Sequence, residues 1–205
     1  MYGDTLLIDA KSRRNALKIF KSMPDLLLKK QSIIAIGGIS GTQKSETANC
    51  LAEILIKAGK ECHILSGDDY YTTFWHDRNE ERQKRGYKIG IHEWDWERLD
   101  WTIETFKNKM YSQIQFCQMS KFSTGLMHSY IDKSACSILI IEGLYACNIK
   151  QADLKIHIGP CDPDSTYEFR KKRKKENESS PFRKKVVEAE CKWVEKLKLK
   201  ADLVL

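Results

Sequence analysis

Apolar residues follow two different spacings along this chain, and the two alternate from residue 32 onward. Short continuous apolar runs are typical of strands buried on both faces of a sheet, and residues 32–36 and 137–141 form such runs after an initial serine. Residues 62–65 and 154–158 also predict strands, although they include polar residues. Elsewhere apolar residues recur every three or four positions, as on one face of a helix, over 45–59, 94–109, 164–176 and 182–197. With a terminal strand at 201–205, this order predicts an α/β fold in which helices cover both faces of a mostly parallel sheet.

Three further segments fall outside this alternation. Residues 1–31 predict one or two amphipathic helices, a helical extension that packs outside the sheet or pairs with another subunit. Residues 113–120 and 126–131 alternate polar and apolar positions around a turn at 123–125, which predicts a β-hairpin insertion. The highly charged stretch 77–86 is expected to be a mobile surface segment.

Length and composition indicate a single main domain over residues 32–205, large enough to bury a core without disulfides. The seven cysteines include no Cys-x-x-Cys pair, so we interpret them as buried thiols in a reducing cytoplasm. No run approaches the about 18 apolar residues of a membrane span, and we expect no membrane partner. The net charge of +7 suits an anionic ligand, whereas a nucleic-acid partner would favour a stronger basic bias.

The segment after the first strand carries the most specific chemistry. It matches the phosphate-loop pattern G-x-x-x-x-G-K-[ST], except that Gln43 replaces the second glycine. In such a loop, backbone N–H groups and Lys44 bind the phosphates of a nucleotide, and the Ser45 hydroxyl binds Mg²⁺. The alternative is a glycine-rich turn without a ligand. The predicted ATP-binding residues are Gly38, Ile39, Ser40, Gly41, Thr42, Gln43, Lys44, Ser45 and Glu46.

Gln43 is the departure that matters in this loop, because a side chain stands where the pattern has none. We expect it either to turn outward or to weaken ATP binding.

Acidic residues follow two of the predicted strands, and the carboxyl ends of parallel strands meet at one edge of a sheet. Asp68 follows the second strand and is the candidate catalytic base, which accepts the proton of an attacking hydroxyl. Its neighbour Asp69 is a weaker candidate, and either residue could instead be a turn or cap aspartate. Glu142 ends the strand at 137–141, where a carboxylate can hold Mg²⁺ directly or through water.

The helix predicted at 164–176 carries the strongest run of positive charge. Arg170 and Arg173 lie three positions apart and therefore on one face, and Arg183 follows a polar break. These residues predict a lid at about 164–185, whose guanidinium groups close over the triphosphate and take part in catalysis. The alternative is an ordinary solvated helix face.

Aromatic and polar residues concentrate in two segments near the same sheet edge. They could form a pocket for the acceptor substrate, in which Asp95 accepts from ribose hydroxyls, although the tryptophans could equally be helix core. With the two aspartates, the predicted substrate-binding residues are Asp68, Asp69, Tyr70, Tyr71, His92 and Asp95.

Four segments together resemble the uridine kinase/phosphoribulokinase group of P-loop kinases, which includes nicotinamide riboside kinases. They are 66–71 (SGDDYY), 94–99 (WDWERL), 138–143 (ILIIEG) and a C-terminal set, which joins 152–158 to Arg170, Arg173 and the ending at 194–205. The resemblance runs from about 32 to 205. It implies a three-layer P-loop NTPase-type fold with a hairpin and a basic lid. It also implies that Asp68 is the base, Asp95 a ribose ligand and Glu142 a residue near Mg²⁺.

This resemblance implies an ATP- and Mg²⁺-dependent kinase acting on a small-molecule hydroxyl, most simply the 5′-hydroxyl of a nucleoside. A shorter likeness to adenylylsulfate kinases covers only 38–45 and 66–69. Because of Gln43, a nucleotide-binding protein with weak or no kinase activity is a further alternative. An RNA- or polyphosphate-binding module would rest on the basic helix alone. A monomer and a homodimer both stay open.

Overall fold

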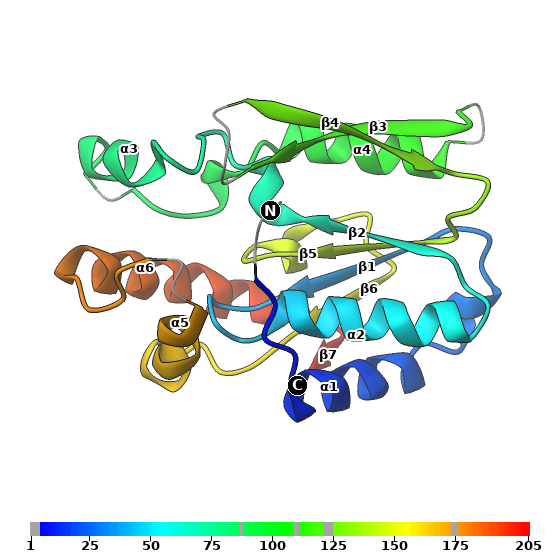
Figure 1. The fold of residues 1–205 in the computed structure, drawn as a ribbon, viewed down its shortest axis with the longest axis horizontal. Helices are drawn as coiled ribbons and strands as arrows, with labels where there is room; N and C mark the ends of the chain where they lie inside the picture. Colours follow the sequence, from blue (N-terminus) through cyan, green and yellow to red (C-terminus); the bar gives the residue numbers. More distant parts are fainter. Residues whose placement is uncertain (1–4, 87, 109–110, 121–124, 174–175) are drawn as a thin grey trace.

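The computed structural model describes residues 5–86, 88–108, 111–120, 125–173 and 176–205. Five parallel strands form the central sheet in the order β2-β5-β1-β6-β7 (Figure 1). Their bounds are β1 (Ser32–Gly37), β2 (Cys62–Ser66), β5 (Ile138–Glu142), β6 (Leu154–His157) and β7 (Leu203–Val204). Of the three central strands, β1 and β5 are buried throughout, because a strand with neighbours and helices on both sides is shielded from water, and they carry the continuous apolar runs. Strand β6 is buried only in its second half. The predicted α/β fold is therefore confirmed.

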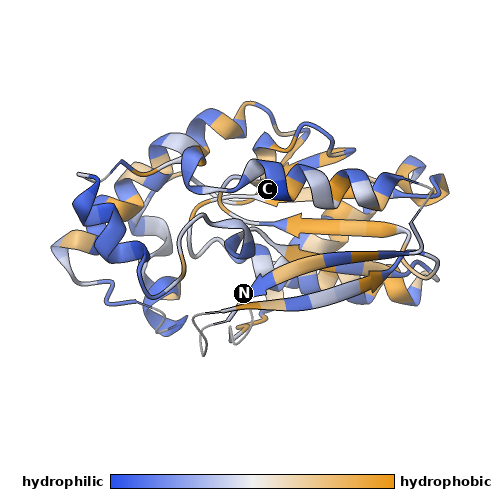
Figure 2. Ribbon diagram, turned by 90° about the horizontal axis from the view of Figure 1, so that it is seen from above, coloured by the Kyte–Doolittle hydropathy of each residue, from blue (hydrophilic) through white to orange (hydrophobic). Residues whose placement is uncertain are grey.

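Two helical layers cover the two faces of the sheet. Successive residues of β1 point to opposite faces, so Ile34 packs in one apolar cluster and Ile33 in the other. Helices α1 (Ala10–Lys21) and α2 (Lys44–Lys57) cover the first face. Helices α4 (Trp96–Lys107) and α6 (Pro181–Lys198) cover the second. Figure 2 shows hydrophobic strands enclosed between helices whose outer surfaces are mostly hydrophilic.

The hairpin β3 (Gln113–Met119) and β4 (Leu126–Asp132) forms a separate antiparallel pair that packs beside α4. Its predicted turn falls largely on 121–124, outside the described residues. Helix α5 (Tyr167–Arg173) lies beyond the carboxyl edge of the sheet with the first part of α6 (Figure 1). Short 3₁₀ turns join the other elements, at Asp25–Leu28, Gly67–Tyr70, Ile91–Glu93, Ala146–Asn148 and Asp164–Thr166.

Two expectations about local structure are wrong. The charged stretch 77–86 is an ordered helix, α3 (Arg78–Lys84), which buries Arg78 and Arg82 on one face while glutamate–lysine pairs lie on the other. Trp94 precedes α4 instead of beginning it, and its indole packs against Gly67 and Gly143, where a Cβ would lie 2.2 and 2.7 Å from the ring.

Two global features complete the fold. All seven cysteines are free thiols. Among the described residues, no helix combines the length and the apolar character that crossing a membrane requires.

Candidate active site

The phosphate loop connects β1 to α2 and depends on its two glycines. Gly38 and Gly41 have φ angles of 149° and 86°, in the region that favours glycine. A Cβ on Gly38 would lie 2.5 Å from the Ile158 carbonyl oxygen, and one on Gly41 would lie 2.7 Å from Arg170 Cγ. The loop is therefore packed closely against both the sheet and α5.

Gln43 is the one described non-glycine residue with a positive φ, at φ 68° and ψ 34°. Its side chain does not turn outward but is buried, and Nε2 donates a hydrogen bond of 2.6 Å to Asp9 Oδ2. Gln43 thus adopts the left-handed backbone conformation expected of the glycine that it replaces, and its side chain is bound by the residue that caps the N-terminal helix.

Lys44 begins α2, so its side chain lies at the positive end of the helix, where unpaired N–H groups favour anions. Its Nζ donates to the carbonyl oxygen of Ile39, 2.9 Å away in the loop. Burial lowers the pKa of Lys44, and the carboxylates of Glu142 and Asp68 oppose that shift. A desolvated ammonium group between two carboxylates is well placed to bind the phosphates of a nucleotide.

Asp68 and Glu142 come from neighbouring parallel strands. Glu142 ends β5 directly opposite Ser66 at the end of β2, and Asp68 lies in the 3₁₀ turn that follows. The Ser66 hydroxyl donates to Glu142 Oε1 at 3.2 Å and accepts from the Asp68 N–H at 3.3 Å. Ser66 therefore orders both acidic residues, a role that the sequence signals only as a serine at the start of a turn.

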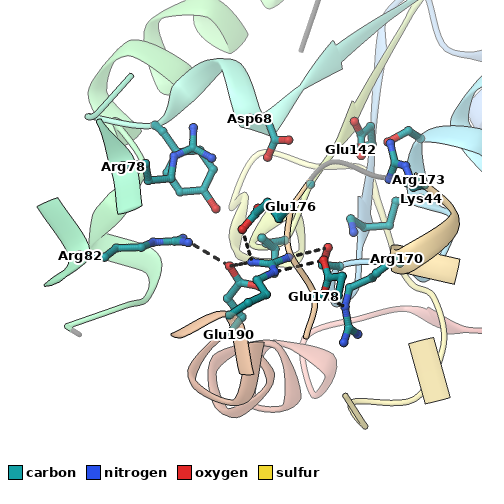
Figure 3. Close-up of a pocket in the computed structure, with 17 residues that line it drawn as sticks. Lys44, Asp68, Arg78, Arg82, Glu142, Arg170, Arg173, Glu176, Glu178 and Glu190 are labelled. Atoms are coloured by element: carbon teal, nitrogen blue, oxygen red, sulfur yellow. Dashed lines mark hydrogen bonds and ion pairs between the residues drawn. The ribbon is translucent and has the colours of Figure 1, made fainter. Parts of the chain in front are cut away.

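The expected groups meet in one cavity (Figure 3): Lys44, Ser45, Asp68 and Glu142 all line it. The Ser45 hydroxyl and the Glu142 carboxylate are oxygen donors of the kind that Mg²⁺ prefers, so this pair fits the predicted metal site. The other lining residues are Ser40, Gly41, Tyr71, Arg78, Arg82, Gly143, Leu144, Arg170, Arg173, Glu176, Glu178, Arg183 and Glu190.

The arginines predicted for the lid are paired with carboxylates. Arg170 is buried, and its Nε donates to Glu178 Oε2 at 2.7 Å. Arg183 donates to the other oxygen of Glu178 at 3.3 Å and to Ser40 Oγ of the phosphate loop at 3.3 Å. A solvated helix face is therefore the wrong interpretation for Arg170.

Arg173 makes the third lid contact. Its Nε lies 3.8 Å from Glu46 Oε1, in the first turn of α2. The segment predicted as a lid is thus joined to both the phosphate loop and the helix that follows it.

Helix α3 contributes two arginines that sequence reasoning missed. Arg82 donates to Glu93 at 2.7 Å and to Glu190 at 3.3 Å, deep in the cavity wall. The Arg78 guanidinium lies 3.5 Å over the centroid of the Tyr71 ring. Its Nε and Nη2 are buried and have no hydrogen-bond partner in the described part of the chain. The sequence did hold one indication of their shared position: Arg78 and Arg82 are four residues apart, which places both side chains on one face of a helix.

Two predicted substrate residues lie behind the cavity wall. The Asp69 carboxylate is buried and accepts from the Met119 N–H of the hairpin at 2.9 Å. Burial raises the pKa of Asp69 to about 6, against the opposing effect of that hydrogen bond. The Tyr70 hydroxyl donates to Thr102 Oγ1 of α4 at 3.2 Å. Both side chains thus join the turn to its surroundings, whereas Tyr71 lines the cavity.

His92 and Asp95 are also absent from the lining of this cavity, as far as the described residues go. The exposed His92 ring contacts the Lys88 carbonyl oxygen at 2.9 Å. Asp95 caps α4 by accepting from the Arg98 N–H at 3.0 Å, and it pairs with the Arg98 guanidinium. Neither residue therefore lines the cavity with Asp68, although the Asp95 N–H donates to the Tyr70 carbonyl oxygen at 2.6 Å, in the turn that carries Asp68.

Comparison with known proteins points to kinases. No model of a known protein family matches the chain. Among curated proteins it is similar to the bifunctional alpha-galactosidase/sucrose kinase AgaSK of Mediterraneibacter gnavus, with 29% identity over 186 residues. The alignment covers 84% of this chain and 20% of that protein, so the chain spans about a fifth of the length of this relative.

Two solved structures resemble the whole fold. A possible uridine kinase from Bacillus stearothermophilus superposes with a TM-score of 0.64 at 17% identity, covering 95% of this chain and 99% of its own. Phosphoribulokinase from Rhodobacter spheroides gives 0.59 at 16% identity, covering 84% and 68%. The predicted resemblance is therefore confirmed for the fold.

Proposed function

We propose that this chain is an ATP- and Mg²⁺-dependent kinase that phosphorylates a hydroxyl group of a small molecule. The observation that carries the proposal is the meeting of Lys44, Ser45, Asp68 and Glu142 in one cavity at the carboxyl edge of the sheet. The kinases among its relatives and fold neighbours support the same reaction class.

Each of these residues has a role in phosphoryl transfer. Lys44 and the loop N–H groups would bind the phosphates, while Ser45 and Glu142 would hold Mg²⁺, which neutralises charge on the phosphate oxygens. Asp68 would orient the acceptor hydroxyl and take its proton. Arg170, Arg173 and Arg183 would exchange their carboxylate partners for phosphate oxygens when a nucleotide binds.

For the acceptor, the predicted resemblance favours a nucleoside. A carbohydrate is the second candidate, because the curated relative is a sucrose kinase and because of the wall beside Asp68. There the Arg78 guanidinium stacks on the Tyr71 ring, and two of its buried nitrogens have no hydrogen-bond partner in the described part of the chain. A rotation of Arg78 into the cavity would offer these donors to the hydroxyls of a sugar.

A turnover screen with ATP and Mg²⁺ tests the proposal, using nucleosides, adenylylsulfate, mono- and disaccharides and sugar phosphates as acceptors. On the best acceptor, Asp68→Asn should lower kcat by about 10²- to 10⁴-fold and leave ATP affinity nearly unchanged. The matched control is Asp77→Asn, which makes the same substitution at an exposed aspartate outside the cavity lining and should behave as the wild type.

Calorimetric titration with ATP separates the alternatives. Tight binding without turnover of any acceptor would favour a nucleotide-binding protein without kinase activity. Failure to bind ATP in the presence of Mg²⁺ would exclude both the kinase and the nucleotide-binding protein without kinase activity. Full turnover by Asp68→Asn would refute the assignment of the base.

A further inference from the structure

We propose that Asp9 is a positioning residue for the nucleotide site, because its carboxylate holds Gln43 in the backbone conformation that the phosphate loop adopts. The inference rests on the proposed function, since it takes ATP as the ligand of the loop. It assigns a role in the site to the N-terminal segment that leads into α1 and precedes the phosphate loop in the chain.

The backbone of Gln43 has a conformation that is rare for a residue other than glycine. Its φ of 68° lies in the left-handed region, which residues other than glycine occupy rarely because the Cβ approaches the backbone carbonyl. Gln43 directly precedes Lys44, the first residue of α2. A return of Gln43 to negative φ would rotate the peptide that follows and move the Lys44 N–H and side chain out of register with the loop.

A hydrogen bond from the Gln43 side chain to Asp9 opposes a return of Gln43 to negative φ. Gln43 Nε2 donates to Asp9 Oδ2 at 2.6 Å; the Gln43 side chain is buried whereas Asp9 is exposed, so water can approach the bond only from the Asp9 side. Hydrogen bonds to an ionised acceptor are stronger than neutral ones. Although burial would raise the pKa of Asp9, hydrogen bonds from Ser12 and Gln43 keep it below its usual value, so the carboxylate stays ionised.

The Asp9 carboxylate is itself held in place by the start of α1. Its other oxygen, Oδ1, caps α1 by accepting the N–H groups of Lys11 and Ser12, each at 2.9 Å. Helix α1 packs against α2 through Ala16 and Ile19, in the same apolar cluster as Leu51 (Figure 1). The carboxylate that restrains Gln43 therefore belongs to a rigid body.

A second hydrogen bond joins the residues just before α1 to the first turn of α2. The Leu7 N–H donates to Glu46 Oε1 at 3.3 Å, and this same oxygen lies 3.8 Å from Arg173 in the lid. Glu46 is completely buried. The N-terminal segment thus contacts both the residue that precedes Lys44 and the residue that joins the lid to α2.

A double-mutant cycle between positions 9 and 43 tests the inference in the full chain. Serine is as good a helix cap as aspartate, but its hydroxyl is too short to reach Gln43. Asp9→Ser should therefore raise the Kd of ATP and the KM for ATP about tenfold, with the KM for the acceptor unchanged. In the Gln43→Gly background, where the left-handed backbone needs no restraint, Asp9→Ser should change the Kd less than twofold.

Two further variants separate positioning from folding. Asp9→Asn keeps the cap, and the Gln43 amide can turn over to accept from the new amide, so ATP affinity should stay near that of the wild type. Ser12→Ala weakens the same cap without touching Gln43, and it should lower the urea midpoint but not ATP affinity.

An equal effect of Asp9→Ser in both backgrounds, or no effect in either, would overturn the inference while leaving the kinase proposal intact. Failure of the wild type to bind ATP would overturn the proposed function itself.

Discussion

Asp68 and Asp69 are adjacent in sequence, but their side chains serve different parts of the molecule. Asp68 lines the cavity, whereas Asp69 is buried against the hairpin and accepts the Met119 N–H at 2.9 Å. Asn at position 69 can keep that acceptor oxygen and removes only the charge. We therefore predict that Asp69→Asn stabilises the protein at neutral pH and leaves catalysis nearly intact.

The magnitude follows from the pKa. Burial raises the pKa of Asp69 from 3.8 to about 6. A group whose folded pKa is raised contributes fully to stability below its unfolded pKa, and the contribution is lost as pH rises through the folded value. The difference of about two units, at about 1.4 kcal/mol each, makes ionised Asp69 cost up to about 3 kcal/mol of the free energy of unfolding.

Urea denaturation of the wild type and Asp69→Asn at intervals from about pH 4 to pH 8 measures this cost. The advantage of the variant should grow mainly between about pH 4 and pH 6, the interval between the two pKa values, and level off above about pH 7. On the same preparations, kcat should change only a few-fold, in contrast to Asp68→Asn. A stability difference that does not vary with pH would refute the reasoning. A tenfold rise in the KM for the acceptor would make Asp69 a substrate ligand instead.

Two further variants probe the charges around the cavity. Glu142→Gln should raise the Mg²⁺ concentration for half-maximal activity about tenfold, because an amide is a poorer Mg²⁺ ligand than a carboxylate. It should also move the alkaline limb of the pH–rate profile to lower pH, since Glu142 opposes the lowering of the Lys44 pKa, and an unchanged Mg²⁺ requirement would contradict the metal assignment. Arg82→Ala leaves Glu93 buried without its arginine and Glu190 with only the 3.9 Å contact to Arg183, and it should lower the free energy of unfolding by about 3 to 5 kcal/mol. A loss below about 1 kcal/mol in urea would contradict that account.

The sequence predicted those parts of the site that depend on regular structure. The apolar runs identified the central strands, and parallel strands must end at the same edge, so Asp68 and Glu142 were expected near the phosphate loop. The glycines of the loop and Lys44 follow a pattern whose spacing is fixed by the ligand.

The parts that were missed depend on contacts between distant segments. Arg82 and Glu190 are 108 positions apart, and Gln43 and Asp9 are 34 apart, so neither pair leaves a local signal. The charged stretch of α3 was expected to be solvated because charge alone does not tell which face of a short helix is buried. Likewise, two adjacent aspartates in a turn point to opposite sides for reasons that only the neighbouring hairpin supplies.

The charges that line the cavity have a consequence for how a ligand reaches it. Among the described residues, six lysine and arginine side chains stand there against five aspartates and glutamates, so the lining is nearly neutral despite the basic chain. The lining therefore adds little to the long-range field, and attraction of an anion toward the site comes from the net charge of the whole protein. Selection of a polyphosphate would begin only on contact, when phosphate oxygens replace glutamates as the partners of the lid arginines. The exchange of ion pairs should thus be a separate step of nucleotide binding, one that follows the long-range attraction of the anion by the basic chain.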